Sequence, residues 1–220
     1  MTILITGANR GIGLALAQEQ IARGETVIGT YRTSHPQIAG IEWQRLSITE
    51  PASHHALSHT LSGRVIDTVV CNAGVYLDAG STLNGGLTAD IWADTFATNV
   101  TGVFLTVEAV MANLRQSDTP KIALISSQMA SHERAPGRSY AYRASKAAVL
   151  NLGRNMATDL RAQGIAVGIF DPGWVVTDMG GQNAEITVTD SARGLSDRLN
   201  SLSIDTTGTF LQWNGQPQAY

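Results

Sequence analysis

The chain has 220 residues, of which 43% are hydrophobic and 15% charged, and its formal net charge is −3 at pH 7. This length suits one domain with a substantial buried core, and the composition excludes an intrinsically disordered chain. The slightly acidic balance offers no basic run for binding phosphate backbones, so we expect no nucleic-acid partner.

The lack of recognisable targeting signals and the single cysteine indicate a cytoplasmic protein. The N-terminal run MTILITGANRG lacks the basic segment and the long apolar core of a signal peptide. No stretch approaches the roughly 20 consecutive apolar residues that a membrane-spanning helix needs. The single cysteine, Cys71, cannot form an internal disulfide, which agrees with a reducing compartment. We therefore expect a cytoplasmic localisation and no membrane partner.

Strand-like and helix-like segments alternate through the first half of the chain. Residues 3–5 (ILI) predict a buried strand that runs into a glycine-rich turn and then a helix with one apolar face. Pro51 suits the first turn of a later helix, because a residue at that position needs no N–H group. Further strands are predicted over residues 26–28, 41–46 and 67–71, and a long helix follows with apolar residues three to four apart between 92 and 107.

The second half continues the same alternation. Residues 121–126 and 165–170 predict two more strands, and the helix between them, over residues 139–163, is ended by Gly164. A helix near 191–199 and a strand near 209–212 complete the chain. The strands are continuous apolar runs, which is typical of parallel sheets covered by helices on both faces. We predict a single α/β domain over residues 1–220, doubly wound around about seven parallel strands.

The first predicted strand runs directly into TGANRGIG, residues 6–13. Gly7 permits a tight bend, Gly11 lets the backbone approach a pyrophosphate, and Gly13 lets the next helix pack close to the strand. The helix N-terminus adds unpaired N–H groups and the positive end of the helix dipole. A plain tight turn is the alternative for such a loop, but its place between a strand and a helix favours nucleotide binding.

Six motifs occur in the order and on the elements of one known family. The glycine loop has the spacing TGxxxGxG, the fourth strand ends in CNAG (71–74), and Asn99 lies within the long helix. Ser126 and Ser127 end the fifth strand, Tyr142 and Lys146 form YxxxK, and PGWVVT (172–177) follows the sixth strand. The chain resembles the short-chain dehydrogenase/reductase family over nearly its whole length. This resemblance implies a Rossmann fold that binds a nicotinamide dinucleotide and has oxidoreductase activity.

The chemistry of Tyr142 and Lys146 also follows from their spacing. Four residues apart on one helix, the two side chains share a face. A phenol with a pKa of about 10 is a poor base at neutral pH, and we expect the Lys146 ammonium to lower the pKa of Tyr142. Tyr142 can then donate a proton to a carbonyl oxygen during reduction or remove one during oxidation. Tyr140 is the nearby alternative, but only Tyr142 is followed by lysine four residues later.

A serine at the end of the fifth strand is expected to donate a hydrogen bond to the developing oxyanion. Ser126 and Ser127 both qualify, and the family pattern favours Ser127, with Ala130 in place of the usual glycine. The resemblance further implies that Lys146 holds the nicotinamide ribose and that Asn99 positions a water in a proton relay; alternatively, Asn99 only caps or kinks its helix. The predicted catalytic residues are Asn99, Ser127, Tyr142 and Lys146.

The end of the second strand indicates which nicotinamide cofactor is used. An acidic residue there would accept the 2′-hydroxyl of NAD(H) and repel the 2′-phosphate of NADP(H). This chain has Tyr31 and Arg32 instead, and Arg10 lies in the glycine loop. Guanidinium groups suit phosphate oxygens, although both arginines could also be solvated surface residues. The missing acid therefore favours NADP(H) over NAD(H).

The remaining cofactor contacts are implied by the resemblance. They are Gly7, Asn9, Arg10, Gly11, Ile12 and Gly13 in the loop, Tyr31, Arg32 and Ile48, Asn72, Ala73 and Gly74, Pro172, Gly173, Val175 and Thr177, together with Tyr142 and Lys146. Ser47-Ile48 replaces the family's Asp-Val, so adenine is held more loosely or by backbone alone. His55 and His59 share a helix face without a third ligand, so we expect no metal site.

The C-terminal part, with DMGG (178–181) after the PG segment and WNGQP (213–217) near the end, resembles a small bacterial branch called C-factor-like, close to the sniffer-type carbonyl reductases. That branch carries a short segment over the active site, which we assign to residues 174–200. Trp174, Val176 and Met179 would then line a compact apolar pocket. His132, Arg134 and Arg143 lie near the catalytic residues in the sequence; they either favour an anionic substrate or, as the default expectation, are exposed charges.

Together these features predict an NADP(H)-dependent oxidoreductase that reduces a small aldehyde or ketone to an alcohol, or catalyses the reverse reaction. The resemblance implies a homo-oligomer, a dimer or a tetramer. The alternative is a nucleotide-sensing or signalling protein on the same fold, because a fold does not fix a function. A complete acid–base set argues against a pure binding module.

Overall fold

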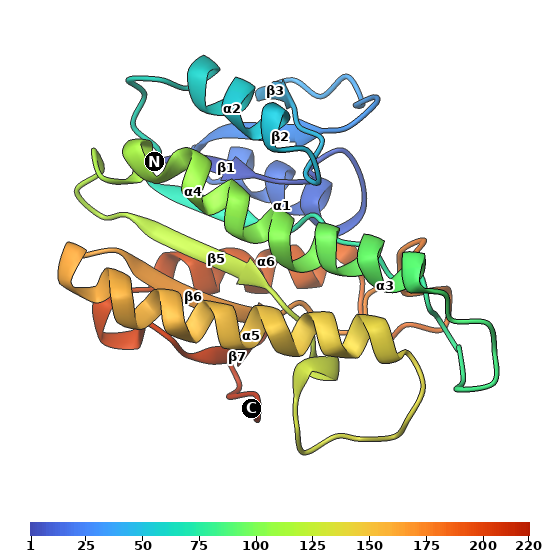
Figure 1. The fold of residues 1–220 in the computed structure, drawn as a ribbon. Coiled ribbons are helices and arrows are strands. Elements are labelled where there is room, and N and C mark those ends of the chain that lie inside the picture. Colours follow the sequence, from blue (N-terminus) through green and yellow to red (C-terminus); the bar gives the residue numbers. More distant parts are fainter.

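Seven parallel strands form a single sheet at the centre of the computed structural model, which describes residues 1–220 (Figure 1). The strands are β1 (Thr2–Ile5), β2 (Thr26–Tyr31), β3 (Ile41–Arg45), β4 (Thr68–Cys71), β5 (Lys121–Ile125), β6 (Ala166–Asp171) and β7 (Phe210–Gln212). They lie in the order β3-β2-β1-β4-β5-β6-β7, and every neighbouring pair is parallel. The direction of winding reverses between β1 and β4, and a crevice for a ligand forms at the carboxyl ends of strands at such a point.

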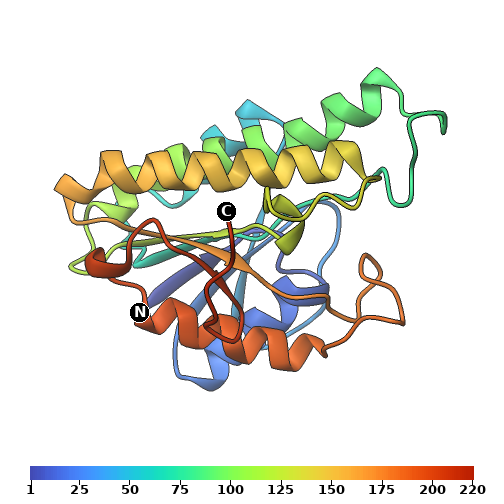
Figure 2. The same cartoon turned by 90° about the horizontal axis from the view of Figure 1, so that it is seen from below.

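Helices cover both faces of the sheet, as the view from below shows (Figure 2). One face carries α2 (Pro51–Thr60), α3 (Ala89–Phe96), α4 (Gly102–Leu114) and α5 (Tyr140–Leu160). The other face carries α1 (Gly11–Ala22) and α6 (Val188–Ser201), which pack against each other. The predicted doubly wound α/β fold with seven parallel strands is therefore confirmed.

The central strands bury apolar side chains on both faces, which is why they are continuous apolar runs. In β1, Leu4 joins the apolar cluster under α4 and α5, whereas Ile3 and Ile5 join the cluster under α1 and α6. The edge strand β3 differs, because only Ile41 of its residues is buried. The strands that carry the site at their ends are thus fixed from both sides.

The long helix predicted after β4 is not regular in the structure. Its two halves, α3 and α4, are joined by a π-helical turn over Ala97–Thr101, and Asn99 lies inside this turn. A single π turn within an α-helix is often found at a functional site. The side-chain periodicity of the segment gave no sign of this extra residue in the turn.

The helical stretch Ala89–Leu114 is long and apolar enough to be compared with a membrane-spanning helix. An 18-residue window within its 26 residues has a mean hydropathy of 1.3, which is enough for a membrane span by length and composition. Here the stretch packs against α2, α5, β4 and β5, and 39% of its most apolar part is buried. A helix that covers a parallel sheet needs an apolar face, so packing within the domain accounts for this composition.

Candidate active site

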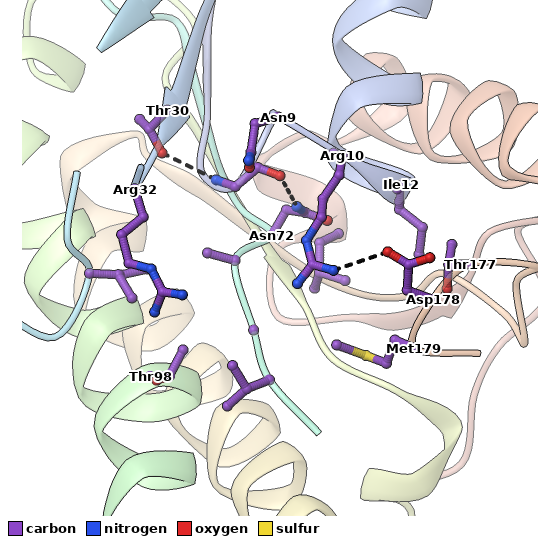
Figure 3. Close-up of a pocket in the computed structure, with 18 of the residues that line it drawn as sticks. Asn9, Arg10, Ile12, Thr30, Arg32, Asn72, Thr98, Thr177, Asp178 and Met179 are labelled. Carbon is purple, nitrogen blue, oxygen red and sulfur yellow. Dashed lines mark hydrogen bonds and ion pairs between the residues drawn. The ribbon is translucent and has the colours of Figure 1, made fainter. Parts of the chain in front are cut away.

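A cleft of about 500 Å³ opens at the carboxyl ends of β1, β2, β4 and β5 (Figure 3). Of the residues that the family resemblance assigns to the cofactor, all but Gly173 and Val175 line this cleft. Those two line a second cavity of about 490 Å³. The cleft and the second cavity, called the side cavity below, share six residues in their walls: Ile12, Ser126, Tyr142, Pro172, Thr177 and Met179. The two spaces therefore adjoin at the residue with the predicted acid–base role.

The glycine loop is held in place by side chains from three strand ends. Thr6 Oγ1 accepts hydrogen bonds from the backbone N–H groups of Asn72 and Ala73, both at 3.0 Å. Asn72 Nδ2 donates to the carbonyl oxygen of Thr6 at 2.9 Å, and Thr30 Oγ1 accepts from the N–H of Gly7 at 3.1 Å. These bonds fix the loop without using the N–H groups at the start of α1, which stay free for a ligand.

Gly13 cannot be replaced by any other residue without moving its neighbours. A Cβ atom there would lie 2.3 Å from the carbonyl oxygen of Gly7 and 2.5 Å from Asn72 Nδ2. Gly7 and Gly11 have φ angles of 64° and 53°, in the left-handed region that other residues rarely adopt. The loop thus combines a close helix–strand approach with two backbone conformations that favour glycine, as the sequence predicted.

Arg10 and Arg32 both line the cleft but are in different electrostatic situations. Arg10 Nη1 pairs with Asp178 Oδ2 at 3.3 Å, and both side chains are largely exposed. Figure 3 shows the Arg10 guanidinium directed at Asp178, whereas Arg32 lies elsewhere in the cleft. Arg32 forms no ion pair, so its charge is available to a phosphate.

The segment that replaces the family's Asp-Val is anchored by α2. The N–H of Ser47 donates to Ser53 Oγ at 2.9 Å, and His54 Nε2 donates to the carbonyl oxygen of Ile48 at 2.9 Å. His54 is buried, and the Ile48 side chain packs against Gly102 and lines the cleft. The sequence reading considered His55 and His59 and missed His54, whose role is to hold this segment.

Lys146 is buried beneath the Tyr142 ring. Its Nζ lies 5.6 Å from the centroid of that ring and donates to the carbonyl oxygen of Ile125 at 2.9 Å. Burial lowers the pKa of Lys146 to about 8, and the carboxylate of Asp171 acts against this change. A lysine in this state still carries its proton at neutral pH, but loses it far more readily than a solvated lysine.

The expectation that Lys146 lowers the pKa of Tyr142 is wrong for this structure. Burial raises the pKa of Tyr142 well above its usual value, the Ser127 side chain opposes this, and Asp171 adds to it. Desolvation by burial is the largest cause of this rise, and a spacing of four residues could not reveal it. At neutral pH Tyr142 holds its proton, which is the form that can donate one.

The two serines at the end of β5 have different surroundings. Ser126 is 1% exposed and its hydroxyl donates to the carbonyl oxygen of Lys146 at 3.1 Å, so it ties β5 to α5. Ser127 lines the side cavity with Tyr142, and its Oγ accepts the N–H of Met129 at 3.1 Å. An Oγ that accepts a backbone N–H directs its own proton elsewhere, which favours Ser127 as the donor to a carbonyl.

Asn99 lies close to the site but lines neither space. Its Oδ1 accepts the N–H of Val75 at 2.8 Å, and its Nδ2 donates to the carbonyl oxygen of Val75 at 2.9 Å and to Ser145 Oγ at 3.0 Å. The amide therefore joins the segment after β4 to α5. The predicted proton-relay role of Asn99 remains a prediction, and its side chain is occupied by this structural task.

Asp78 is a residue of the site that the sequence reading missed. It is fully buried, and its two carboxylate oxygens accept the N–H groups of Ala141 (2.8 Å) and Tyr142 (3.2 Å). It thereby caps α5, whose N-cap residue Ser139 makes no side-chain cap. Tyr76, two residues before Asp78, bonds Ser139 Oγ at 2.5 Å, and its ring lies 4.3 Å from the Tyr142 ring. The segment 76–78 thus fixes the position of Tyr142.

Asp171, the last residue of β6, was also missed. Its side chain is almost fully buried and accepts the N–H of Gly173 at 3.1 Å. Burial raises the pKa of Asp171, and Lys146 acts in the opposite direction. An acid directly before a Pro-Gly pair was the only sequence signal for it.

The substrate-covering segment expected over residues 174–200 reaches the side cavity only through residues 174–180. Trp174 and Met179 line that cavity, but Val176 does not; Val175 takes its place. Trp174 Nε1 donates to the carbonyl oxygen of Gly180 at 2.7 Å, which closes the segment on itself. Residues 188–201 form α6, which packs on α1.

Replacing Lys146 with Met is expected to stabilise the protein at neutral pH by about 3 kcal/mol, because about 1.4 kcal/mol accompanies each pKa unit. Folding lowers the pKa of Lys146 from 10.5 to about 8, so below pH 8 the folded state bears the cost of a buried charge. Between pH 8 and 10.5 the unfolded chain holds more of this proton, and the cost disappears as pH rises. Urea unfolding of both proteins at pH 7 and pH 10 measures the effect. An equal gain in the free energy of unfolding at both pH values would contradict the lowered pKa of Lys146.

Comparisons with known proteins agree with this geometry. A family model described as short chain dehydrogenase matches residues 1–186. The C-signal protein of Myxococcus xanthus is 36% identical over 151 residues, which cover 68% of this chain and 90% of that protein. The 1-hydroxy-2-glutathionyl-2-methyl-3-butene dehydrogenase of Rhodococcus sp. is 32% identical over 96% of this chain and 99% of its own length.

A solved structure extends this likeness to the whole fold. The NADPH-bound carbonyl reductase from chicken fatty liver superposes with a TM-score of 0.91 and is 29% identical, with 100% of this chain and 98% of that chain covered. The glycine loop, the strand order and the place of Tyr142 and Lys146 beside the cleft fit the same conclusion. The chain belongs to the short-chain dehydrogenase/reductase family.

Proposed function

We propose that this protein is an NADP(H)-dependent oxidoreductase that reduces a small aldehyde or ketone to its alcohol, or catalyses the reverse oxidation. The observation that carries this proposal is the place of Tyr142, in the wall that the cleft and the side cavity share. A dinucleotide in the cleft and a carbonyl compound in the side cavity would meet at this side chain. The likeness to a carbonyl reductase supports the choice of substrate.

The residues of the cleft fit a dinucleotide with a 2′-phosphate. The free N–H groups at the start of α1 would bind the pyrophosphate, and the closely packed Gly13 leaves no side chain in its way. Arg32, which forms no ion pair, would bind the 2′-phosphate. The chicken carbonyl reductase was solved with NADPH, which supports NADP(H) as the cofactor here.

In the proposed reduction a bound nicotinamide supplies the hydride. Tyr142 donates its proton to the carbonyl oxygen, and the Ser127 hydroxyl donates a hydrogen bond to the same oxygen as negative charge develops there. The Lys146 ammonium lies below the ring, where a positive charge attracts the phenolate that remains but does not offset the burial that raises the pKa of Tyr142. Since burial raises the pKa of Tyr142, the phenol is protonated and ready for reduction at neutral pH. The same feature makes oxidation dependent on high pH.

Replacing Arg32 with Asp is expected to weaken NADPH binding about tenfold to a hundredfold, because a charge-assisted hydrogen bond is worth about 1.5–3 kcal/mol. NADH affinity should stay within about threefold, because NADH has no 2′-phosphate. Fluorescence titration with both nucleotides measures the difference. Arg161→Asp, at an exposed arginine outside the cleft, carries the same charge change and serves as the control. An equal loss for NADPH and NADH would overturn the 2′-phosphate assignment.

The proposed reaction is tested by following NADPH consumption, with NADH in parallel, across a panel of aldehydes and ketones. Turnover that prefers NADPH supports the proposal, and failure to bind either nucleotide overturns it. Tight NADPH binding without any turnover would favour the alternative, a nucleotide-sensing or signalling protein. The likeness to a relative named C-signal is the observation that keeps this alternative open.

We also propose that the protein acts in the cytoplasm as a homo-oligomer, a dimer or a tetramer. Trp92 of α3 and Phe104 of α4 are 37% and 47% exposed, and large exposed apolar side chains on neighbouring helical segments favour association. Light scattering coupled to size-exclusion chromatography measures the assembly, and a monomer at micromolar concentration would contradict it.

A further inference from the structure

The side cavity has an apolar wall and a cationic rim. Met129, Pro136, Trp174 and Met179 contribute apolar surface. Among the residues that line the cavity, Arg134 and Arg143 carry the only charges, and no acidic residue lines it. The space next to Tyr142 is thus asymmetric, with a hydrophobic side and two guanidinium groups.

Arg143 follows Tyr142 directly on α5. Its Nη1 donates to the carbonyl oxygen of Arg134 at 3.4 Å, and its Nε is buried without any hydrogen-bond partner. A buried guanidinium N–H without a partner costs free energy, which a bound acceptor would recover. Arg143 also forms no ion pair, so its positive charge is not neutralised by the protein.

Arg134 is the second cation and is equally free of acidic partners. Its guanidinium bonds the side-chain amide oxygen of Gln128, a neutral group that lines the same cavity. Glu133, the exposed neighbour of Arg134 in the chain, forms no ion pair with either arginine, Asp178 pairs with Arg10, and Asp171 lies buried at the end of β6. Burial raises the pKa of Asp171 overall although the positive charge of Arg134 acts to lower it, and Asp171 does not line the cavity.

We propose that the substrate carries an anionic group, a carboxylate or a phosphate, that Arg134 and Arg143 bind. This inference rests on the proposed carbonyl reduction, because the substrate's carbonyl is placed at Tyr142 and Ser127. A guanidinium group forms paired, charge-assisted hydrogen bonds with either anion. The apolar wall then holds the part of the molecule between the carbonyl and the anion. On this proposal Arg134 and Arg143 determine substrate specificity and are not merely exposed charges.

The test compares three aldehydes of similar shape with NADPH as reductant. They are 4-carboxybenzaldehyde, its neutral analogue methyl 4-formylbenzoate, and 4-formylphenyl phosphate. The wild-type kcat/KM is expected to be at least about tenfold higher for the better of the two anions than for the neutral ester, mainly through KM. The ratio between the two anions tells carboxylate from phosphate. Equal kcat/KM for all three, or a preference for the ester, would overturn the proposal.

Arginine variants tie the preference to the rim. Arg143→Gln and Arg134→Gln are each expected to lower kcat/KM for the preferred anion about tenfold and to leave the neutral ester within about twofold. Arg138→Gln removes the same charge from the loop that carries Arg134 and precedes α5, outside the cavity lining, and is the matched control. A loss that is the same for anions and ester, or the same in the control, contradicts the assignment. Thermal melts verify that each variant folds.

A binding measurement separates this proposal from the proposed reaction. Calorimetric titration of 4-carboxybenzaldehyde and 4-formylphenyl phosphate into the protein with NADP⁺ present reports anion binding without turnover. Binding that weakens about tenfold in Arg143→Gln supports the anion site even if no aldehyde is reduced, in which case the proposed reaction alone fails. No binding of either anion, together with turnover of the neutral ester, rejects the anion site and leaves the reductase standing.

Discussion

Replacing Tyr142 with Phe is expected to lower kcat for carbonyl reduction by about 10²–10⁴-fold, the usual worth of a positioned general acid. The Kd for NADPH should stay within about threefold, because the ring that lies over Lys146 remains in place. Only the proton that would pass to the carbonyl oxygen is removed. Steady-state rates with a reactive aldehyde, together with fluorescence titration of NADPH, measure both quantities.

Tyr140→Phe is the matched control for this change. Tyr140 is the first residue of α5, two positions before Tyr142, and lines neither the cleft nor the side cavity. Its loss of a hydroxyl should leave kcat within about twofold. A Tyr142→Phe protein that keeps a tenth or more of the wild-type kcat would show that another group supplies the proton.

Replacing Gly13 with Ala is expected to remove NADPH binding almost entirely. The new methyl group would lie 2.3 Å from the carbonyl oxygen of Gly7, a backbone atom that can move only if the loop moves. Overpacking of this kind costs about 3 kcal/mol of stability, and a displacement of about 1 Å in the binding backbone costs about a hundredfold in function. Urea unfolding and nucleotide titration give the two effects separately.

Gln18→Ala, at an exposed position of the same helix, is the control for substitution within α1. It should change neither stability by more than about 0.5 kcal/mol nor NADPH affinity. If Gly13→Ala bound NADPH as the wild type does, the close approach of α1 to β1 would have no part in nucleotide binding.

The fold and the outline of the cleft were predictable from local patterns. The apolar strands, the glycine loop and the end of β2 can each be recognised from a few neighbouring residues. Nearly all of the residues assigned to the cofactor in this way line one cleft. The spacing of Tyr142 and Lys146 likewise predicted that their side chains would lie together. Sequence patterns work here because each one describes a contact between near neighbours or a single strand end.

The electrostatics of the site could not be predicted in this way. The pKa of Tyr142 depends on how completely the surrounding chain excludes water, and burial is a property of the whole fold. Asp171 gave a faint signal before its Pro-Gly pair, whereas Asp78 gave none, because its partners are more than sixty residues away along the chain. The π turn that holds Asn99 also leaves the apolar spacing of its helix unchanged.

The cap that Asp78 provides has a consequence for how the enzyme folds. The first turn of α5 obtains its hydrogen-bond acceptors from a segment 63 residues earlier in the chain, so a loop of that length must close before the turn is stable. Contacts between distant segments form late, because chain entropy opposes them until much of the structure is present. The central pairing of β1 with β4 joins residues equally far apart, such as Ile3 and Thr68, so the sheet and the position of Tyr142 depend on loop closures of similar length.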